Sequence, residues 1–160
     1  MSQEFILGLE APNFELSDQT GKTVSLHSVL KEGPVMLVFY PGDFTMVCTK
    51  QLCNYRDHWS DFKGFGIQVV GVSANTTQDH ARFAEEFKFP FLLLSDPKKQ
   101  VAKAYGCTSL LMFGGISRAV FLISKDGVGR YRYVEPTILT RRKASELIGI
   151  IADLRARELL

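Results

Sequence analysis

The stretch from Pro34 to Asp57, PVMLVFYPGDFTMVCTKQLCNYRD, most constrains the fold of this chain. It opens with an apolar run that is long enough for a strand buried on both faces and too short for a free-standing helix. Pro41 and Gly42 end that strand. Asp43 and Thr45 are both candidate N-cap residues, and the run from about Met46 to Trp59 contains no Pro or Gly. The stretch therefore predicts a buried strand, a short turn and a helix.

Cys48 falls in the first turn of that predicted helix. Backbone N–H groups are unpaired there, and the positive end of the helix dipole favours an anion. A thiol at this position is therefore biased toward thiolate, the form in which cysteine is a nucleophile.

Length and composition predict one domain over residues 1–160. The chain is 46% hydrophobic and 22% charged, which suits one globular unit with a sizeable core. Its formal net charge of +2 combines 19 basic and 17 acidic residues, too balanced to indicate a nucleic-acid partner. The basic cluster Arg141 to Lys143 is interpreted as a solvated helix start.

The sequence also predicts a cytoplasmic protein with no membrane partner. The first residues, MSQEFILGLEAPNFEL, lack a basic region, a long apolar core and a small-residue cleavage site. No later stretch approaches the roughly 20 apolar residues that span a bilayer. Three cysteines are too few, and odd in number, for a secreted disulfide framework, which leaves catalytic, redox or buried roles.

Strand and helix patterns alternate along the chain. The first is a hairpin of residues 13–16 and 23–26 around Asp18 to Gly21, and a second hairpin flanks Lys125 to Gly127. Further strands are expected at Ile67–Ser73 and Phe91–Leu94. Helices are expected as a single turn at Ser28–Lys31 and at Gln78–Phe87, Pro97–Tyr105 and Arg141–Glu158. The pattern predicts an α/β fold in which helices cover both faces of a mixed sheet.

Specific spacings then point to a family. Pro41, Thr45 and Cys48 stand as P-x-x-x-T-x-x-C, and Cys53 follows as C-T-K-Q-L-C. This arrangement closely resembles the peroxiredoxins, and within them the bacterioferritin-comigratory-protein or PrxQ type. Arg118 in SRAVFLISKDG matches the arginine strand of the family. Similar segments at the start of the chain and at residues 91–106 extend the likeness over nearly the whole chain.

The resemblance implies a thioredoxin fold and a cofactor-free thiol peroxidase. It implies that Cys48 attacks a hydroperoxide and becomes a sulfenic acid, and that Arg118 lies beside it to hold the thiolate and the peroxide oxygens. Thr45 would bond the incoming peroxide, and Pro41 would keep water from the pocket. Thioredoxin is the reductant that the resemblance suggests, for a monomer or weak homodimer.

Two positions depart from the pattern of the family. Met46 stands where the family usually has proline, and Gln51 where it usually has glutamate. A glutamate there could pair with Arg118, whereas a neutral amide leaves more of the field of the cation for the thiolate. Neither departure removes a reacting group.

Cys53 is the expected resolving thiol. An ideal helix places residues i and i+5 about 8 to 9 Å apart between Cα atoms, and disulfides rarely exceed about 7 Å. The first two turns must therefore unwind before Cys48 and Cys53 can bond, although a buried Cys53 without a redox role is the alternative. Cys107 is outside the pattern of the family and is expected to be buried, with an additional reactive thiol as the alternative.

Other chemistries have weaker support in the sequence. Histidines and cysteines lack the paired spacing of a zinc site, and no G-x-G-x-x-G or G-x-x-x-x-G-K-[ST] motif indicates a nucleotide. A thioredoxin-like disulfide reductase stays open, although it would ordinarily carry C-x-x-C. A non-enzymatic redox sensor, in which Met46 and Gln51 have slowed turnover, also stays open.

Overall fold

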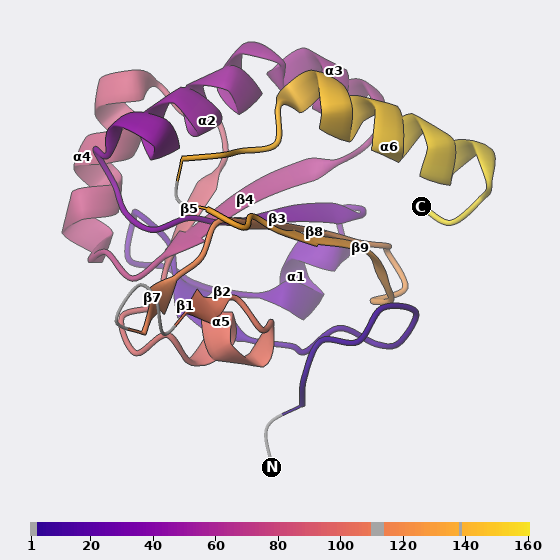
Figure 1. Ribbon diagram of the computed structural model, residues 1–160, viewed down its shortest axis with the longest axis horizontal. Coiled ribbons are helices and arrows are strands. Elements are labelled where there is room, and N and C mark those ends of the chain that lie inside the picture. The colour runs from indigo at the N-terminus through magenta and orange to yellow at the C-terminus, as the bar shows by residue number, and fades with distance from the viewer. Residues whose placement is uncertain (1–2, 110–113, 138) are drawn as a thin grey trace.

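The apolar run before Pro41 forms strand β3 (Val35–Phe39), an inner strand that lies between β4 and β8 in Figure 1. The computed structural model describes residues 3–109, 114–137 and 139–160. Every residue of β3 is buried, because helices cover both faces of the sheet. One neighbour, β4 (Gln68–Ser73), is parallel to it, and the other, β8 (Ala119–Ile123), is antiparallel.

Among the described residues, seven strands form one sheet in the order β2-β1-β5-β4-β3-β8-β9. The parallel pairs are β3 with β4 and β4 with β5, and the other pairs are antiparallel. The remaining strands are β1 (Glu15–Ser17), β2 (Thr23–Ser25), β5 (Leu92–Ser95) and β9 (Gly129–Val134). The mixed sheet and both predicted hairpins are confirmed.

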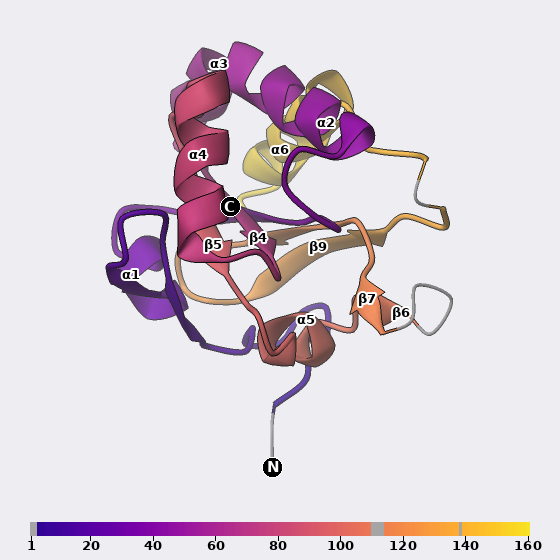
Figure 2. The same cartoon turned by 90° about the vertical axis from the view of Figure 1, so that its left-hand side faces the viewer.

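Two layers of helices enclose the sheet (Figures 1 and 2). The layer on one face contributes its apolar side chains to a cluster that includes Cys48, and its members are α2 (Met46–Asp57), α3 (Trp59–Gly64), α4 (Thr77–Phe87) and α6 (Ala144–Ala156). The opposite layer contains α1 (Leu26–Leu30) and α5 (Gln100–Ala104). Among the described residues, no helix has the length and apolar character needed to cross a membrane.

The helix expected from Met46 to Trp59 is interrupted at His58. Helix α2 ends at Asp57 and α3 begins at Trp59. The backbone of His58 leaves the helical region at φ −106° and ψ 18°, and its ring Nδ1 lies 2.9 Å from the carbonyl oxygen of Asn54. A side chain that bonds the backbone of its own helix competes with the next turn, and no Pro or Gly marks this break in the sequence.

Two other helix starts differ from the prediction. Pro97 lies in a turn, and α5 begins only at Gln100, because Lys99 adopts a left-handed conformation with φ +57° and the Asp96 carboxylate accepts the N–H of Gln100 at 3.1 Å. Helix α6 begins at Ala144 rather than Arg141, and its first N–H donates to the Asn54 side chain at 2.8 Å. A short hairpin of β6 (Thr108–Ser109) and β7 (Gly115–Ile116) was not predicted.

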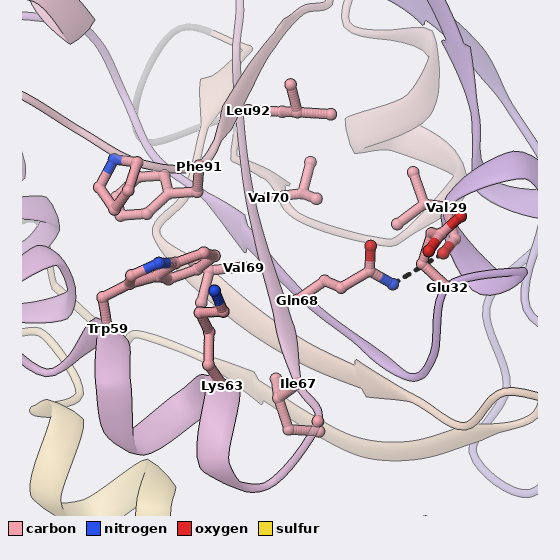
Figure 3. A pocket seen from close by; sticks show the side chains of 12 residues that line it. Val29, Glu32, Trp59, Lys63, Ile67, Gln68, Val69, Val70, Phe91 and Leu92 are labelled. Atoms are coloured by element: carbon pink, nitrogen blue, oxygen red, sulfur yellow. Dashed lines mark hydrogen bonds between the residues drawn. The ribbon is translucent and has the colours of Figure 1, made fainter.

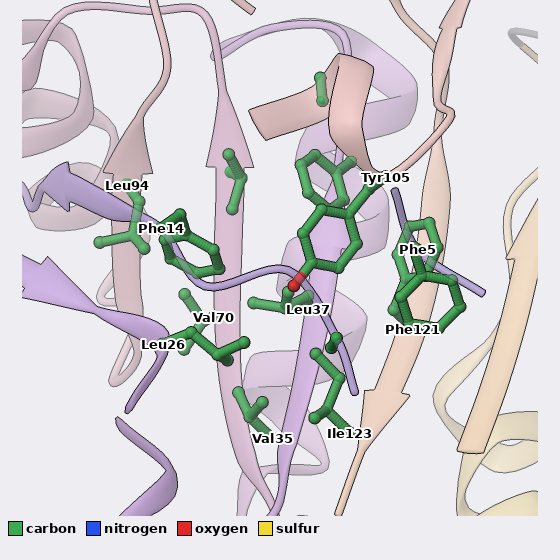
Figure 4. Packing of buried hydrophobic residues seen from close by; sticks show 14 of the residues in the cluster. Phe5, Phe14, Leu26, Val35, Leu37, Val70, Leu94, Tyr105, Phe121 and Ile123 are labelled. Carbon is green, nitrogen blue, oxygen red and sulfur yellow. The ribbon is translucent and has the colours of Figure 1, made fainter. Parts of the chain in front are cut away.

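Phe121 of β8 is central to the cluster on the α1 and α5 face. It is fully buried, and its ring lies 4.8 Å from Phe5, 5.5 Å from Phe39 and 5.1 Å from Tyr105, between ring centroids. Figure 4 shows the Phe5, Tyr105 and Phe121 rings together in this cluster. These contacts join the N-terminal segment, α5 and two strands of the sheet.

Replacing Phe121 by alanine should therefore lower the free energy of unfolding by about 3 to 5 kcal/mol, the usual cost of removing a buried ring. Urea unfolding of the reduced protein measures it. Ile6→Ala is the control, because Ile6 is 54% exposed and an exposed substitution changes stability by about 0.5 kcal/mol or less. Equal losses in the two variants would contradict the packing described here.

Candidate active site

The turn between β3 and α2 places Cys48 at the buried start of a helix. Thr45 is the N-cap residue, so Cys48 is the third residue of α2, and its side chain is fully buried. The N–H groups of a first helical turn have no partner within the helix, and the helix dipole adds positive potential there. The predicted position of Cys48 is confirmed.

Arg118 reaches Cys48 because of the register between β3 and β8. Ala119 pairs with Phe39, so Arg118, the residue before β8, lies at the end of β3 from which the chain turns into α2. Its Nη1 donates to the Cys48 sulfur at 3.2 Å, and the side chain is almost entirely buried. A guanidinium that stays charged at all physiological pH values therefore contacts the sulfur directly.

Gln51 binds the same guanidinium one turn further along α2. Its Oε1 accepts from Arg118 Nη1 at 2.7 Å, and its Nε2 donates to the Tyr55 hydroxyl at 3.0 Å. Tyr55 donates in turn to the carbonyl oxygen of Arg142 at 2.7 Å. Burial raises the pKa of Tyr55, so its hydroxyl keeps its proton for this bond. The chain of bonds fixes the amide with its oxygen toward Arg118.

Thr45 and Pro41 lie on the turn that leads into α2. Thr45 is exposed, and its hydroxyl donates to the Gly42 carbonyl oxygen at 3.1 Å instead of accepting from the helix backbone. Pro41 is half-buried and directly follows the buried Tyr40. Thr45 is thus the N-cap by backbone position, as predicted, but it makes no side-chain cap bond.

The other two cysteines occupy different environments. Cys53 is half-buried in α2, five residues after Cys48, and both are unbonded. Burial raises the pKa of the Cys53 thiol. Cys107 is completely buried, donates to the Ala102 carbonyl oxygen at 3.4 Å, and has its pKa raised by burial. The expected burial of Cys107 is confirmed, and the neighbouring residues 110–113 lie outside the described part of the chain.

A buried polar cluster below the turn was missed by sequence reasoning. The Asp43 carboxylate accepts from Tyr40 and lies against the ring of His80. The sequence indicates Asp43 only as an alternative helix cap, and a lone histidine in a helix pattern, such as His80, carries no signal of its own. The Asp43 carboxylate is committed to these partners, which leaves Thr45 as the N-cap residue.

Among the described residues, no group of three or more His, Cys, Asp or Glu side chains is placed to hold a metal ion. A cavity of about 360 Å³ lies away from Cys48, at the N-terminal ends of β4 and β5 (Figure 3). Trp59, Phe91 and Lys63 line it, and none of the predicted site residues does.

Comparisons with known proteins agree with this geometry. The family model described as AhpC/TSA family matches residues 7–132. The chain belongs to the AhpC/TSA family.

Its resemblance to the PrxQ type of peroxiredoxin is also confirmed. The chain is 45% identical over 127 residues to "Peroxiredoxin Q, chloroplastic" of Triticum aestivum, a match that covers 79% of this chain and 58% of that protein. The corresponding protein of Sedum lineare is 43% identical over 127 residues, with 79% of this chain and 67% of the relative covered. The chain thus spans less than two thirds of the length of the wheat protein.

A solved structure extends the likeness over the whole fold. The crystal structure of peroxidoxin BcpB from Mycobacterium tuberculosis superimposes with a TM-score of 0.82 at 32% sequence identity. The match covers 96% of this chain and 98% of the other. The expected thioredoxin fold of the peroxiredoxins is therefore confirmed.

Gln51 is the departure from the peroxiredoxin pattern whose effect can be measured. In Gln51→Glu a carboxylate would take the place of the amide oxygen 2.7 Å from Arg118, and part of the positive field would be neutralised. We predict that Cys48 of Gln51→Glu becomes reactive toward iodoacetamide only at a higher pH than in the wild type. The measurement is the rate of alkylation by iodoacetamide as a function of pH, in proteins that also carry Cys53→Ser and Cys107→Ser, so that Cys48 is the only thiol. A shift to lower pH would refute this reading of Gln51.

Proposed function

We propose that this chain is a thiol-dependent peroxidase that reduces hydrogen peroxide and organic hydroperoxides. The observation that carries the proposal is the 3.2 Å contact between Arg118 Nη1 and the Cys48 sulfur at the start of α2. A buried cation and a helix N-terminus both favour the thiolate over the thiol. The same guanidinium can hold the oxygen that becomes negative as the O–O bond breaks.

The reaction is a displacement at oxygen. The Cys48 thiolate attacks the terminal peroxide oxygen, a sulfur–oxygen bond forms and the O–O bond breaks. The leaving oxygen takes a proton and departs as water or an alcohol, while Cys48 becomes a sulfenic acid. We assign Arg118 and Thr45 to binding the two peroxide oxygens and Pro41 to shielding the thiolate from water.

Cys53 is proposed to resolve the sulfenic acid. Its thiolate attacks the Cys48 sulfur, the sulfur–sulfur bond forms as the S–O bond breaks, and the leaving hydroxyl takes a proton and departs as water. On an ideal helix the two Cα atoms are about 8 to 9 Å apart, beyond the usual limit of about 7 Å for a disulfide. The first turns of α2 must therefore unwind between the two steps, and unwinding also removes the burial that raises the pKa of Cys53.

The disulfide would then be reduced by thioredoxin or a similar dithiol protein, as the resemblance to peroxiredoxins suggests. No metal or cofactor enters any of these steps. A cytoplasmic location and a monomeric or weakly dimeric state stay predictions from the sequence and the resemblance.

Peroxide consumption with dithiothreitol as reductant tests the proposal. Wild-type protein should consume hydrogen peroxide at a saturable catalytic rate, and Cys48→Ser should abolish this rate because it removes the nucleophile. Cys107→Ser is the matched control and should turn over nearly as fast as the wild type, because the buried Cys107 hydrogen-bonds within the core.

Each alternative predicts a different result in the same assay. Slow oxidation that stops after one equivalent of peroxide would favour a redox sensor. Reduction of insulin disulfides without peroxide turnover would favour a thioredoxin-like reductase, which shares the fold but ordinarily uses a C-x-x-C pair.

Unwinding of α2 gives a second prediction. Far-UV circular dichroism of the Cys48–Cys53 disulfide form should show less helix than the reduced form, by about the first two turns of α2. The Cys53→Ser variant, which cannot form this disulfide, should keep its helix content under the same mild oxidant. Identical spectra for the oxidised and reduced wild-type protein would count against the resolving role of Cys53.

A further inference from the structure

The buried pair of Asp43 and His80 takes no part in the chemistry proposed above. The two side chains are 1% and 0% exposed, and His80 Nδ1 lies 2.7 Å from Asp43 Oδ2. The other ring nitrogen, Nε2, lies 3.0 Å from the carbonyl oxygen of Leu94. Burying such a pair costs desolvation free energy, so the pair is expected to have a structural or functional role.

Hydrogen bonding determines how many protons the pair carries. A backbone carbonyl only accepts, so His80 Nε2 must carry a proton to bond Leu94. A second proton must lie between Nδ1 and the carboxylate, because two lone pairs would otherwise face each other at 2.7 Å. The pair therefore holds two protons, one on Nε2 and one shared between Nδ1 and the carboxylate.

Asp43 ties the turn before α2 to three other elements. Its Oδ1 accepts from the hydroxyl of Tyr40, at the end of β3, at 2.6 Å. Its backbone N–H donates at 2.9 Å to Asn75, which follows β4, and His80 belongs to α4. Burial and the neighbouring carboxylate raise the pKa of Tyr40, so this hydroxyl keeps its proton. Both oxygens of the carboxylate and the N–H of the same residue are thus engaged.

Phe44 shows that contacts with α4 stabilise the turn before α2. Its φ is +63°, a left-handed conformation that a bulky side chain rarely adopts without support. Its ring lies 4.9 Å from that of Phe83 and 6.4 Å from that of Phe87, both on α4, between centroids. The turn therefore meets α4 through Asp43 and through Phe44, and neither contact involves α2.

We propose that Asp43 and His80 are positioning residues that fix the start of α2 and thereby hold Cys48 against Arg118. The proposal rests on the proposed function for its catalytic meaning, and its geometry is independent of it. Four residues lie between Asp43 and Cys48, and the five steps from one Cα atom to the next can extend about 17 Å. Asp43 can therefore stay in place while the first turns of α2 unwind to bring Cys48 to Cys53.

Asp43 and the bonds that hold it to Tyr40, Asn75 and His80, here called the anchor, also limit how far unwinding spreads. With Asp43 fixed, the freed segment begins after it. Without the anchor the freed segment extends back through Pro41, and the extra chain entropy favours the unwound state. Loss of the anchor should therefore speed disulfide formation, which needs the unwound state, and should lessen oxidation to the sulfinic acid, in which a second peroxide transfers oxygen to the sulfenic sulfur and leaves as water.

Hydrogen exchange of the reduced protein tests the anchor without any peroxide chemistry. In the wild type the amide of Asp43, bonded to Asn75, should exchange more slowly than the amide of Thr49, which makes an early bond of α2 to Thr45. After formation of the Cys48–Cys53 disulfide with diamide, the Asp43 amide should stay protected. The proposal is overturned if, in the reduced protein, the Asp43 amide exchanges as fast as the Thr49 amide.

Variants test the effect on the reaction. In Asp43→Ala the Cys48–Cys53 disulfide should form at least about tenfold faster from the sulfenic acid, because the turn loses both side-chain hydrogen bonds of Asp43. More peroxide should then be needed to produce sulfinic acid, measured by mass spectrometry. Asp43→Asn should recover most of the wild-type rate, because its amide can accept from Tyr40 and donate to a neutral His80 whose Nε2 still donates to Leu94.

Val70→Ala is the matched control, because Val70 is buried in the cluster on the other face of the sheet. It should lower the melting temperature and leave the disulfide rate unchanged. Equal acceleration in Val70→Ala and Asp43→Ala would overturn the positioning role in favour of general destabilisation. If Asp43→Ala does not fold, the hydrogen-exchange rates of the wild type and the disulfide rate of Asp43→Asn still test the positioning role. A wild type without peroxide turnover that keeps its Asp43 amide protected would refute only the proposed function.

Discussion

The contact between the Arg118 guanidinium and the Cys48 sulfur is the interaction on which the site depends. Both groups are buried, and 70 residues separate them in the chain. A buried cation is costly unless it is paired, and here its Nη1 donates to a sulfur and to the oxygen of Gln51. A guanidinium in contact with the sulfur favours the thiolate over the neutral thiol, and the thiolate is the form of cysteine that acts as a nucleophile.

The fold supplies this contact through strand register and helix placement. Antiparallel pairing of β3 with β8 puts Arg118 at the end of β3, and the turn into α2 leaves the sheet at the same end. Helices on both faces exclude water from β3, so the sulfur lies in a medium of low dielectric constant, where charges interact strongly. The sheet and the helix that the proposed Cys48–Cys53 disulfide would unwind thus meet at one point of the chain, between Asp43 and Cys48.

Much of this could be read from the sequence because local patterns settled it. The apolar run before Pro41 could only be a buried strand, and Thr45 with Cys48 marked the start of a helix. The proximity of Arg118 came only from the resemblance to peroxiredoxins, since no local rule reports strand register across 70 residues. The break at His58, the cap of α5 by Asp96 and the Asp43–His80 pair were missed because each depends on a side chain whose partner is fixed by tertiary structure.

The most direct test of the account is the alkylation rate of Cys48 as a function of pH. It is measured with iodoacetamide in the Cys53→Ser, Cys107→Ser background, with and without Arg118→Leu. The account predicts faster alkylation at mildly acidic pH than for an ordinary exposed cysteine, because the thiolate is the reactive form, and a slower rate when Arg118 is removed. A profile that follows a free thiol, or one that Arg118→Leu leaves unchanged, would contradict it.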